Sequence, residues 1–153
     1  MIKINVFSEE KSWSKKLKKK NFFFEKICQA FPKKYKFLKK EISFSLLLSN
    51  NLNIKRLNKK FRNKNKATDI LSFPLDKKKK ISKKTYIGDI IISYNFINKP
   101  KSQNLKIFKQ KLIKIFIHGF LHLLGFDHVK NSDYIKMLKE EKKIYQSVIS
   151  KIK

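Results

Sequence analysis

Residues 102–128, with the sequence SQNLKIFKQKLIKIFIHGFLHLLGFDH, decide the fold. Apolar positions and one glycine recur three or four residues apart within this stretch, at Leu105, Phe108, Leu112, Ile115 and Gly119. Such spacing places them on one stripe of an amphipathic helix. The last turns are apolar nearly all round, as expected for a helix end that is buried. The sequence therefore predicts a long helix over residues 102–124 with a buried end.

All three histidines of the chain lie in this stretch, at the spacing His-x-x-x-His-x-x-Gly-x-x-His. His118 and His122 are four residues apart, so their rings project from the same side of the helix. Gly125 accepts a left-handed turn, which would bring His128 back to the same point. Three neutral nitrogen ligands with one open position are typical of a catalytic zinc site, where bound water becomes acidic. The alternative is three buried histidines with structural hydrogen bonds.

One class of metalloprotease uses the same histidine spacing, with a catalytic glutamate directly after the first histidine. Gly119 occupies that position here. A glycine has no side chain to act as a general base. The sequence therefore predicts a zincin-like histidine helix but argues against peptide hydrolysis by that route.

The remaining elements are predicted from their periodicity. Alternating or continuous apolar runs predict strands over residues 2–7, 41–49, 68–73 and 86–94. Helices are expected over residues 8–31, on the stripe of Ile54, Leu57 and Phe61 capped by Ser49 or Asn50, and after a cap at Asn131, Ser132 or Asp133. The inner face of that last helix is expected to hold Tyr134, Met137, Leu138, Ile144, Tyr145 and Val148.

These elements predict an α/β (α+β) fold in a single domain over residues 1–153. We expect a small mixed sheet of about four strands, packed by about four helices. The lysine-rich residues 75–85 are expected to form an exposed loop, because like charges repel each other.

Composition limits the class of protein. The chain has 153 residues, of which 41% are hydrophobic, enough for one globular core. Cys28 is the single cysteine, so we expect a buried thiol rather than a disulfide. No apolar run is long enough to span a bilayer, and the first residues do not resemble a signal peptide. We therefore expect no membrane association and a cytoplasmic location.

The chain is strongly basic, with 39 Lys and Arg against 11 Asp and Glu and a net charge of +28. Such a charge attracts polyanions, namely RNA, DNA or an anionic membrane surface. The abundance of Lys, Asn, Ile and Phe and the presence of only Arg56 and Arg62 also fit drift in an AT-rich genome. The charge alone therefore does not decide between RNA binding and genome composition.

Three segments together resemble a known family. Residues 118–128 are similar to the signature of the YbeY-type rRNA maturation factors, which are metal-dependent endoribonucleases. Residues 57–62 with 68–74 resemble a second signature of that family, and residues 87–93 resemble its central strand. The order and the length also agree. Ala67 stands where the family usually has proline, and the loop after Pro74 is more basic than in relatives.

This resemblance implies a single-strand-specific, zinc-dependent endoribonuclease with one Zn²⁺ per chain. It implies a role in maturation of small-subunit (16S) ribosomal RNA, with the small ribosomal subunit and assembly factors as partners. It also implies that Arg62 is catalytic, which is physically reasonable because arginine can grip a phosphate with two hydrogen bonds. Two alternatives stay open: a non-catalytic assembly factor that binds rRNA and keeps a structural metal, and another zinc hydrolase.

Several polar residues near the motifs have two interpretations. Asp127 adjoins a predicted ligand, where it orients a histidine, tunes the bound water or caps the turn. Asp69 and Asp89 interrupt apolar strands, and we favour capping or turn hydrogen bonds for both. Thr68 and Ser72 are interpreted as turn residues.

Overall fold

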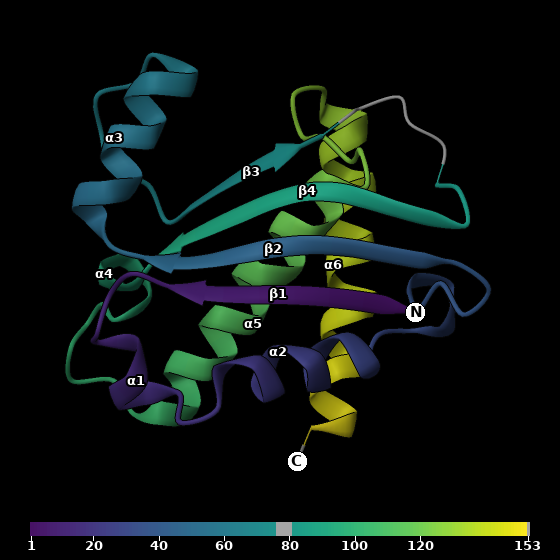
Figure 1. The fold of residues 1–153 in the computed structure, drawn as a ribbon, viewed down its shortest axis with the longest axis horizontal. Coiled ribbons are helices and arrows are strands. Elements are labelled where there is room, and N and C mark those ends of the chain that lie inside the picture. The colour runs from purple at the N-terminus through teal and green to yellow at the C-terminus, as the bar shows by residue number, and fades with distance from the viewer. Residues whose placement is uncertain (76–80, 153) are drawn as a thin grey trace.

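A four-stranded mixed sheet forms the centre of the fold in the computed structural model, which describes residues 1–75 and 81–152 (Figure 1). Its strands, in spatial order, are β1 (Ile2–Ser8), β2 (Glu41–Ser49), β4 (Lys84–Ser93) and β3 (Ile70–Pro74). β1, β2 and β4 run parallel, and β3 pairs antiparallel to β4 at the edge. The predicted mixed sheet of four strands in an α/β fold is confirmed.

The described residues hold six α-helices and one 3₁₀ turn. They are α1 (Trp13–Lys16), α2 (Lys20–Gln29), the 3₁₀ turn Lys33–Tyr35, α3 (Asn51–Arg62), α4 (Tyr94–Ile97), α5 (Leu105–Leu123) and α6 (Asn131–Lys151). Figure 1 shows α5 crossing behind the strands with α6 beside it. In the described part of the chain, no helix has the length and hydropathy that a membrane crossing requires.

The main core lies between the sheet and α5. Alternate residues of β2 point to this face and are fully buried: Ile42, Phe44, Leu46 and Leu48. The ring centroids of Phe116 and Phe120 lie 6.0 and 5.6 Å from that of Phe44. Because these two residues are four apart on α5, their packing fixes which side of that helix faces the sheet.

On the opposite face of the sheet, α3 packs against one part of β3 and β4 (Figure 1). Ile91 of β4 packs with Leu71 and Ile54 in a second, smaller cluster, whereas its neighbours Ile90 and Ile92 belong to the main core. Side chains alternate along a strand, so the two clusters lie on opposite faces. The Asn50 side chain caps α3 by accepting a hydrogen bond from the Asn53 N–H at 2.9 Å, as the sequence predicts.

The single helix expected over residues 8–31 is wrong, because the chain breaks between α1 and α2. Leu17 adopts extended backbone angles of φ −125° and ψ 105° at the end of α1. The break lets Trp13 donate from Nε1 to the Ser49 carbonyl at 2.9 Å, in the core, while Phe24 and Ile27 of α2 are also fully buried. One straight helix could not place both Trp13 and the α2 residues in the core.

Other boundaries also differ from the sequence expectation. The edge strand begins at Ile70 rather than at residue 68. Of the loop expected over residues 75–85, positions 84 and 85 belong to β4, and 76–80 lie outside the described residues. The cap of α6 is Lys130, which makes no side-chain capping bond, rather than a residue of 131–133.

Some positions placed on inner helix faces are exposed instead, with exposed fractions of 37–59%: Leu105, Phe61, Tyr134 and Leu138. Cys28 is buried as expected. Burial raises the pKa of its thiol, because an apolar surrounding disfavours the thiolate.

Gly88, in the sheet, has no room for a side chain. It has φ 139° in a bulge of β4, and a Cβ there would lie 2.3 Å from the Phe73 carbonyl oxygen. A Cβ at Gly119 would meet the end of the Ile70 side chain at 2.6 Å, which can move.

We predict that Gly88→Ala lowers the free energy of unfolding by about 2–4 kcal/mol, because a backbone clash and a strained φ add together. Gly119→Ala should cost about 1 kcal/mol, since the alanine favours the helix and Ile70 can repack. Urea unfolding of the two variants beside the unmodified protein measures both values. Equal losses in the two variants would contradict this account of Gly88.

Candidate metal centre

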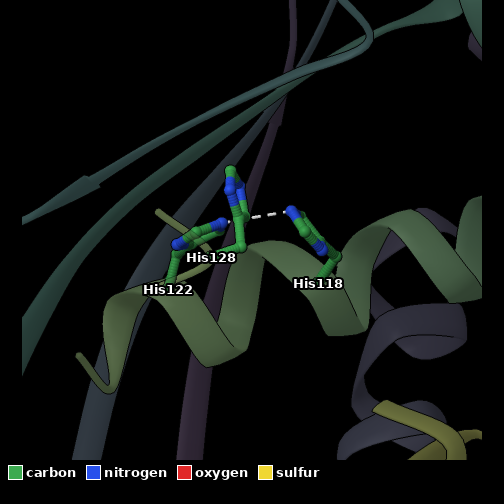
Figure 2. Close-up of side chains that lie close together, drawn as sticks. All are labelled: His118, His122 and His128. Atoms are coloured by element: carbon green, nitrogen blue, oxygen red, sulfur yellow. Dashed lines mark hydrogen bonds between the residues drawn. The ribbon is translucent and has the colours of Figure 1, made fainter. Parts of the chain in front are cut away.

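The three histidines come together at the C-terminal end of α5 (Figure 2). His118 and His122 project from successive turns of the helix, and their Nε2 atoms are 3.1 Å apart. His128 lies in the segment that follows the helix. One ring nitrogen from each of the three residues lies within 4.8 Å of the others. The structure therefore brings together all three residues that the spacing singled out.

A glycine turn returns the chain to the helix, as the sequence predicts. Gly125 has φ 99°, and its N–H donates to the His122 carbonyl at 3.0 Å. The Phe126 N–H donates to the Leu121 carbonyl at 3.0 Å. This pair of bonds is the Schellman motif, which satisfies the last carbonyls of a helix when glycine accepts the left-handed conformation. The turn directs His128 toward the other two histidines.

Hydrogen bonds at Nδ1 fix the orientation of two of the imidazole rings. Nδ1–H of His122 donates to the Phe126 carbonyl at 2.9 Å. Nδ1 of His118 faces Oε1 of Glu141 at 2.5 Å, a contact that favours a proton on Nδ1. Both Nε2 atoms then carry lone pairs that face each other.

The geometry fits a bound cation. Two imidazole lone pairs at 3.1 Å repel each other unless a positive charge lies between them. A tetrahedral zinc ion with Zn–N bonds of about 2.0–2.1 Å keeps its ligand nitrogens about 3.3 Å apart, close to the distance found here. The donor set, three nitrogens held as neutral rings, suits Zn²⁺ among the common ions. The three side chains could therefore hold one metal ion.

Burial keeps His122 neutral. The pKa of its ring is lowered to about 4, chiefly because burial penalises the charged form and further because His118 and His128 would repel it. A histidine binds a metal ion as the neutral ring. Because His122 is already neutral at neutral pH, it loses no proton when the ion binds. The side chain of His118 is 29% exposed and His128 is exposed, which leaves the centre open to solvent on one side.

Gly119 lies away from the three rings. A Cβ on this residue would point at β3, 2.6 Å from Cδ1 of Ile70 and 3.0 Å from Oγ of Ser72. The Ser72 hydroxyl donates to the Gly119 carbonyl at 3.2 Å. A glutamate here would have to displace the Ile70 and Ser72 side chains, and its Cβ would point at β3, which agrees with the sequence argument against protease activity.

Arg62 ends α3 at the edge of β3. Its Nη2 donates to the Ser72 carbonyl at 3.1 Å, and its guanidinium lies 5.9 Å from the ring centroid of Phe73. The side chain of the same Ser72 binds Gly119, the residue after His118. Arg62 is thus exposed and held by the strand that packs on the histidine helix.

Asp127 supports the turn before His128. Its Oδ1 accepts a hydrogen bond from the His128 N–H at 2.7 Å. The carboxylate is also close enough to His122 to favour the charged form of that ring. The contact with the backbone matches the capping interpretation, and its charge acts on a predicted ligand as well.

Asp69 and Asp89 accept hydrogen bonds from neighbouring side chains rather than the capping or turn bonds expected of them. Thr68 donates from Oγ1 to Oδ1 of Asp69 at 3.3 Å, and Tyr86 donates its hydroxyl proton to Asp89. The contact between Ser72 and Gly119 joins β3 to α5, a role beyond a turn. Asp69 additionally lines a cleft beside His118.

Glu141 is the residue of this centre that the sequence argument missed. It belongs to α6 and binds His118 across the two helices, while its neighbour Glu140 accepts bonds from Tyr35 at 2.6 Å and Lys34 at 2.8 Å and anchors the same helix. A signal was present in the sequence. Glu141 is four residues after the inward-facing Met137, so it falls on the face of α6 that packs against α5.

Comparisons with known proteins identify the family of this chain. The model of the family described as endoribonuclease YbeY matches residues 5–149. An endoribonuclease YbeY from Pelagibacter ubique is 59% identical over 152 residues, covering 99% of each chain. One from Bartonella bacilliformis is 32% identical over 152 residues, covering 99% of this chain and 96% of its own.

A solved structure also matches. The solution structure of TM1509 from Thermotoga maritima has a TM-score of 0.58 and 25% sequence identity, and the match covers 97% of this chain and 90% of that one. The family resemblance drawn from the three sequence motifs is confirmed.

We predict that Glu141→Gln weakens zinc binding by about 10- to 100-fold, because the amide no longer fixes His118 as a negative partner does. Competition with a chromophoric chelator measures the affinity. The control is Glu25→Gln, which removes an exposed carboxylate from α2. Equal zinc affinity in both variants would show that Glu141 does not position His118.

Proposed function

We propose, since the chain belongs to the endoribonuclease YbeY family, that it is a zinc-dependent endoribonuclease specific for single-stranded RNA. A single domain over residues 1–153 carries the activity. Its biological reaction is the processing of ribosomal RNA, in particular maturation of 16S rRNA in the small subunit. The observation that carries the proposal is the convergence of three histidine nitrogens, two of them on rings fixed from behind.

His118, His122 and His128 would hold one Zn²⁺. When bound, the ion supplies a Lewis acid and lowers the pKa of a coordinated water. The protein's own contribution is positional. Glu141 and the Phe126 carbonyl orient two of the rings, and the hydrogen bond from the His128 N–H to Asp127 shapes the turn that carries the third. Because the centre is open on one side, a phosphodiester can approach it.

Arg62 is proposed to bind substrate phosphate. A guanidinium has five N–H donors, and the bond to the Ser72 carbonyl uses one of them. The remaining donors on this exposed side chain can grip a phosphate and balance the charge that grows as the phosphodiester is cleaved. Phe73 and Ser72 hold the guanidinium in place, so little side-chain freedom would be lost on binding.

The basic surface around Arg62 supports an RNA substrate. Helix α3 carries exposed cations over its length, at Lys55, Arg56, Lys59, Lys60 and Arg62. A row of this kind attracts the RNA backbone irrespective of sequence. The small ribosomal subunit and its assembly factors are the proposed partners, and the cytoplasm, where ribosomes are assembled, is the proposed location.

Two other functions make different demands. A zinc protease of the matching histidine spacing needs a glutamate where Gly119 packs tightly on β3. A non-catalytic assembly factor with a structural metal would need no open side at the centre and no phosphate-gripping arginine. The exposed His128 and Arg62 favour the enzyme.

The metal proposal predicts about one zinc per chain in gently purified protein. His118→Ala, His122→Ala and His128→Ala should each retain far less zinc, since two imidazoles bind the ion more weakly than three. Elemental analysis measures zinc, and circular dichroism checks that each variant is folded. Full zinc in any folded histidine variant would remove that residue from the ligand set.

The catalytic proposal predicts that Arg62→Ala lowers kcat/KM on single-stranded RNA by about 100-fold, because one preorganised charge at the transition state is lost. Zinc content should not change. The matched comparison is Arg56→Ala, which removes another exposed arginine of the same row and should lower kcat/KM far less than Arg62→Ala does.

Initial rates on a defined ribosomal RNA fragment measure the effect of both substitutions. Wild-type rates in Arg62→Ala would remove Arg62 from the catalytic residues. No cleavage by the unmodified protein, together with normal rRNA processing in cells that carry Arg62→Ala, would favour the scaffold over the enzyme.

A further inference from the structure

A cleft of about 480 Å³ lies beside the histidine centre. Its walls come from the start of β3, from α4, from α5 and from α6, and His118 and Glu141 form part of the lining. The cleft is therefore continuous with the metal centre. Its size falls within the range of about 300–1,000 Å³ that is common for small-molecule sites.

One face of α5 forms the floor of this cleft. Lys111, Lys114, Ile115 and His118 line it at spacings of three and four residues, which places them in one row along the helix. At 1.5 Å per residue, Lys111 lies about 10 Å along the axis from His118. A ligand that touches His118 and extends along this face meets the two lysines next.

The cleft combines cations with an apolar wall. Nζ of Lys111 donates to the Lys99 carbonyl at 2.5 Å, which uses one of its three donors, and Lys114 is exposed beside the ring of Tyr145 at 5.0 Å. On the other side, Phe96 of α4 is 41% exposed although it is a large apolar residue. Cations beside an exposed aromatic ring are the combination that proteins use for single-stranded nucleic acid.

We propose that this cleft binds a nucleotide that adjoins the scissile phosphate of a single-stranded RNA. Its base stacks on Phe96 against the apolar wall, and Lys111 and Lys114 bind its phosphates. The proposal rests on the proposed function and adds a substrate site to it, separate from Arg62 on α3. Because the floor is the same helix face that carries His118, a strand bound here leads directly into the metal centre.

The remaining carboxylate of the wall suits such a ligand. Asp69 accepts one hydrogen bond from Thr68 at 3.3 Å, and a carboxylate has acceptor sites for several more. A ribose hydroxyl and the amino groups of bases are donors that it can accept from.

The test measures binding of a dye-labelled, single-stranded RNA of about ten nucleotides to the zinc-loaded protein by fluorescence anisotropy. Gel analysis of each sample verifies that the RNA is intact. We expect Phe96→Ala to weaken binding about tenfold through lost stacking. For Lys111→Ala/Lys114→Ala, the plot of log affinity against log salt should become shallower by about 1.4, or about 0.7 for each lost phosphate contact.

Matched controls separate the cleft from general charge and hydrophobicity. Lys106→Ala/Lys109→Ala removes two lysines at the same spacing from the same helix, and Phe22→Ala removes an exposed phenylalanine from α2. Zinc content and unfolding are measured for every variant. If the cleft variants bind RNA like their controls, or if the unmodified protein binds no RNA, the inference is overturned.

Cleavage of the same RNA distinguishes this inference from the function on which it rests. Weaker binding in the cleft variants, without any cleavage by the unmodified protein, would support RNA binding in the cleft and contradict the endoribonuclease activity. Normal cleavage and normal binding in the cleft variants would contradict RNA binding in the cleft and leave the proposed endoribonuclease activity intact.

Discussion

Helix α5 must bury one side against the sheet, and the arrangement of the functional side chains follows from that packing. Phe116 and Phe120 lie against Phe44 in the main core. Gly119 lets β3 approach the same helix closely. Residues three and four apart share a side of a helix, so the packed side determines which residues remain for the other. His118 and His122 fall outside the side that packs on the sheet, and both are partly buried.

The histidine centre depends on contacts from outside α5 as well. The rings are held by the Phe126 carbonyl after the helix and by Glu141 on α6, so the Schellman turn and the packing of α6 both contribute. Burial disfavours a proton on His122, as its pKa of about 4 indicates. The arrangement is therefore prepared to accept a cation without first losing a proton from that ring.

Local patterns were enough to predict the histidine centre and most of the sheet. The four-residue spacing of His118 and His122 and the turn at Gly125 depend only on helix geometry, and the alternation in β2 depends only on strand geometry. The break after Trp13 could not be predicted in this way, because it depends on the Ser49 carbonyl and on core partners far along the chain. The contact of Glu141 with His118 depends on how two helices pack, which a single-helix pattern does not contain.

X-ray absorption at the zinc edge of the zinc-loaded protein tests the central claim most directly, because it reports the atoms bound to the ion. The account predicts three imidazole nitrogens at about 2.0–2.1 Å together with an oxygen ligand at the open position. A shell of oxygen ligands without imidazole, or a sulfur ligand at about 2.3 Å, would contradict a zinc centre built from His118, His122 and His128.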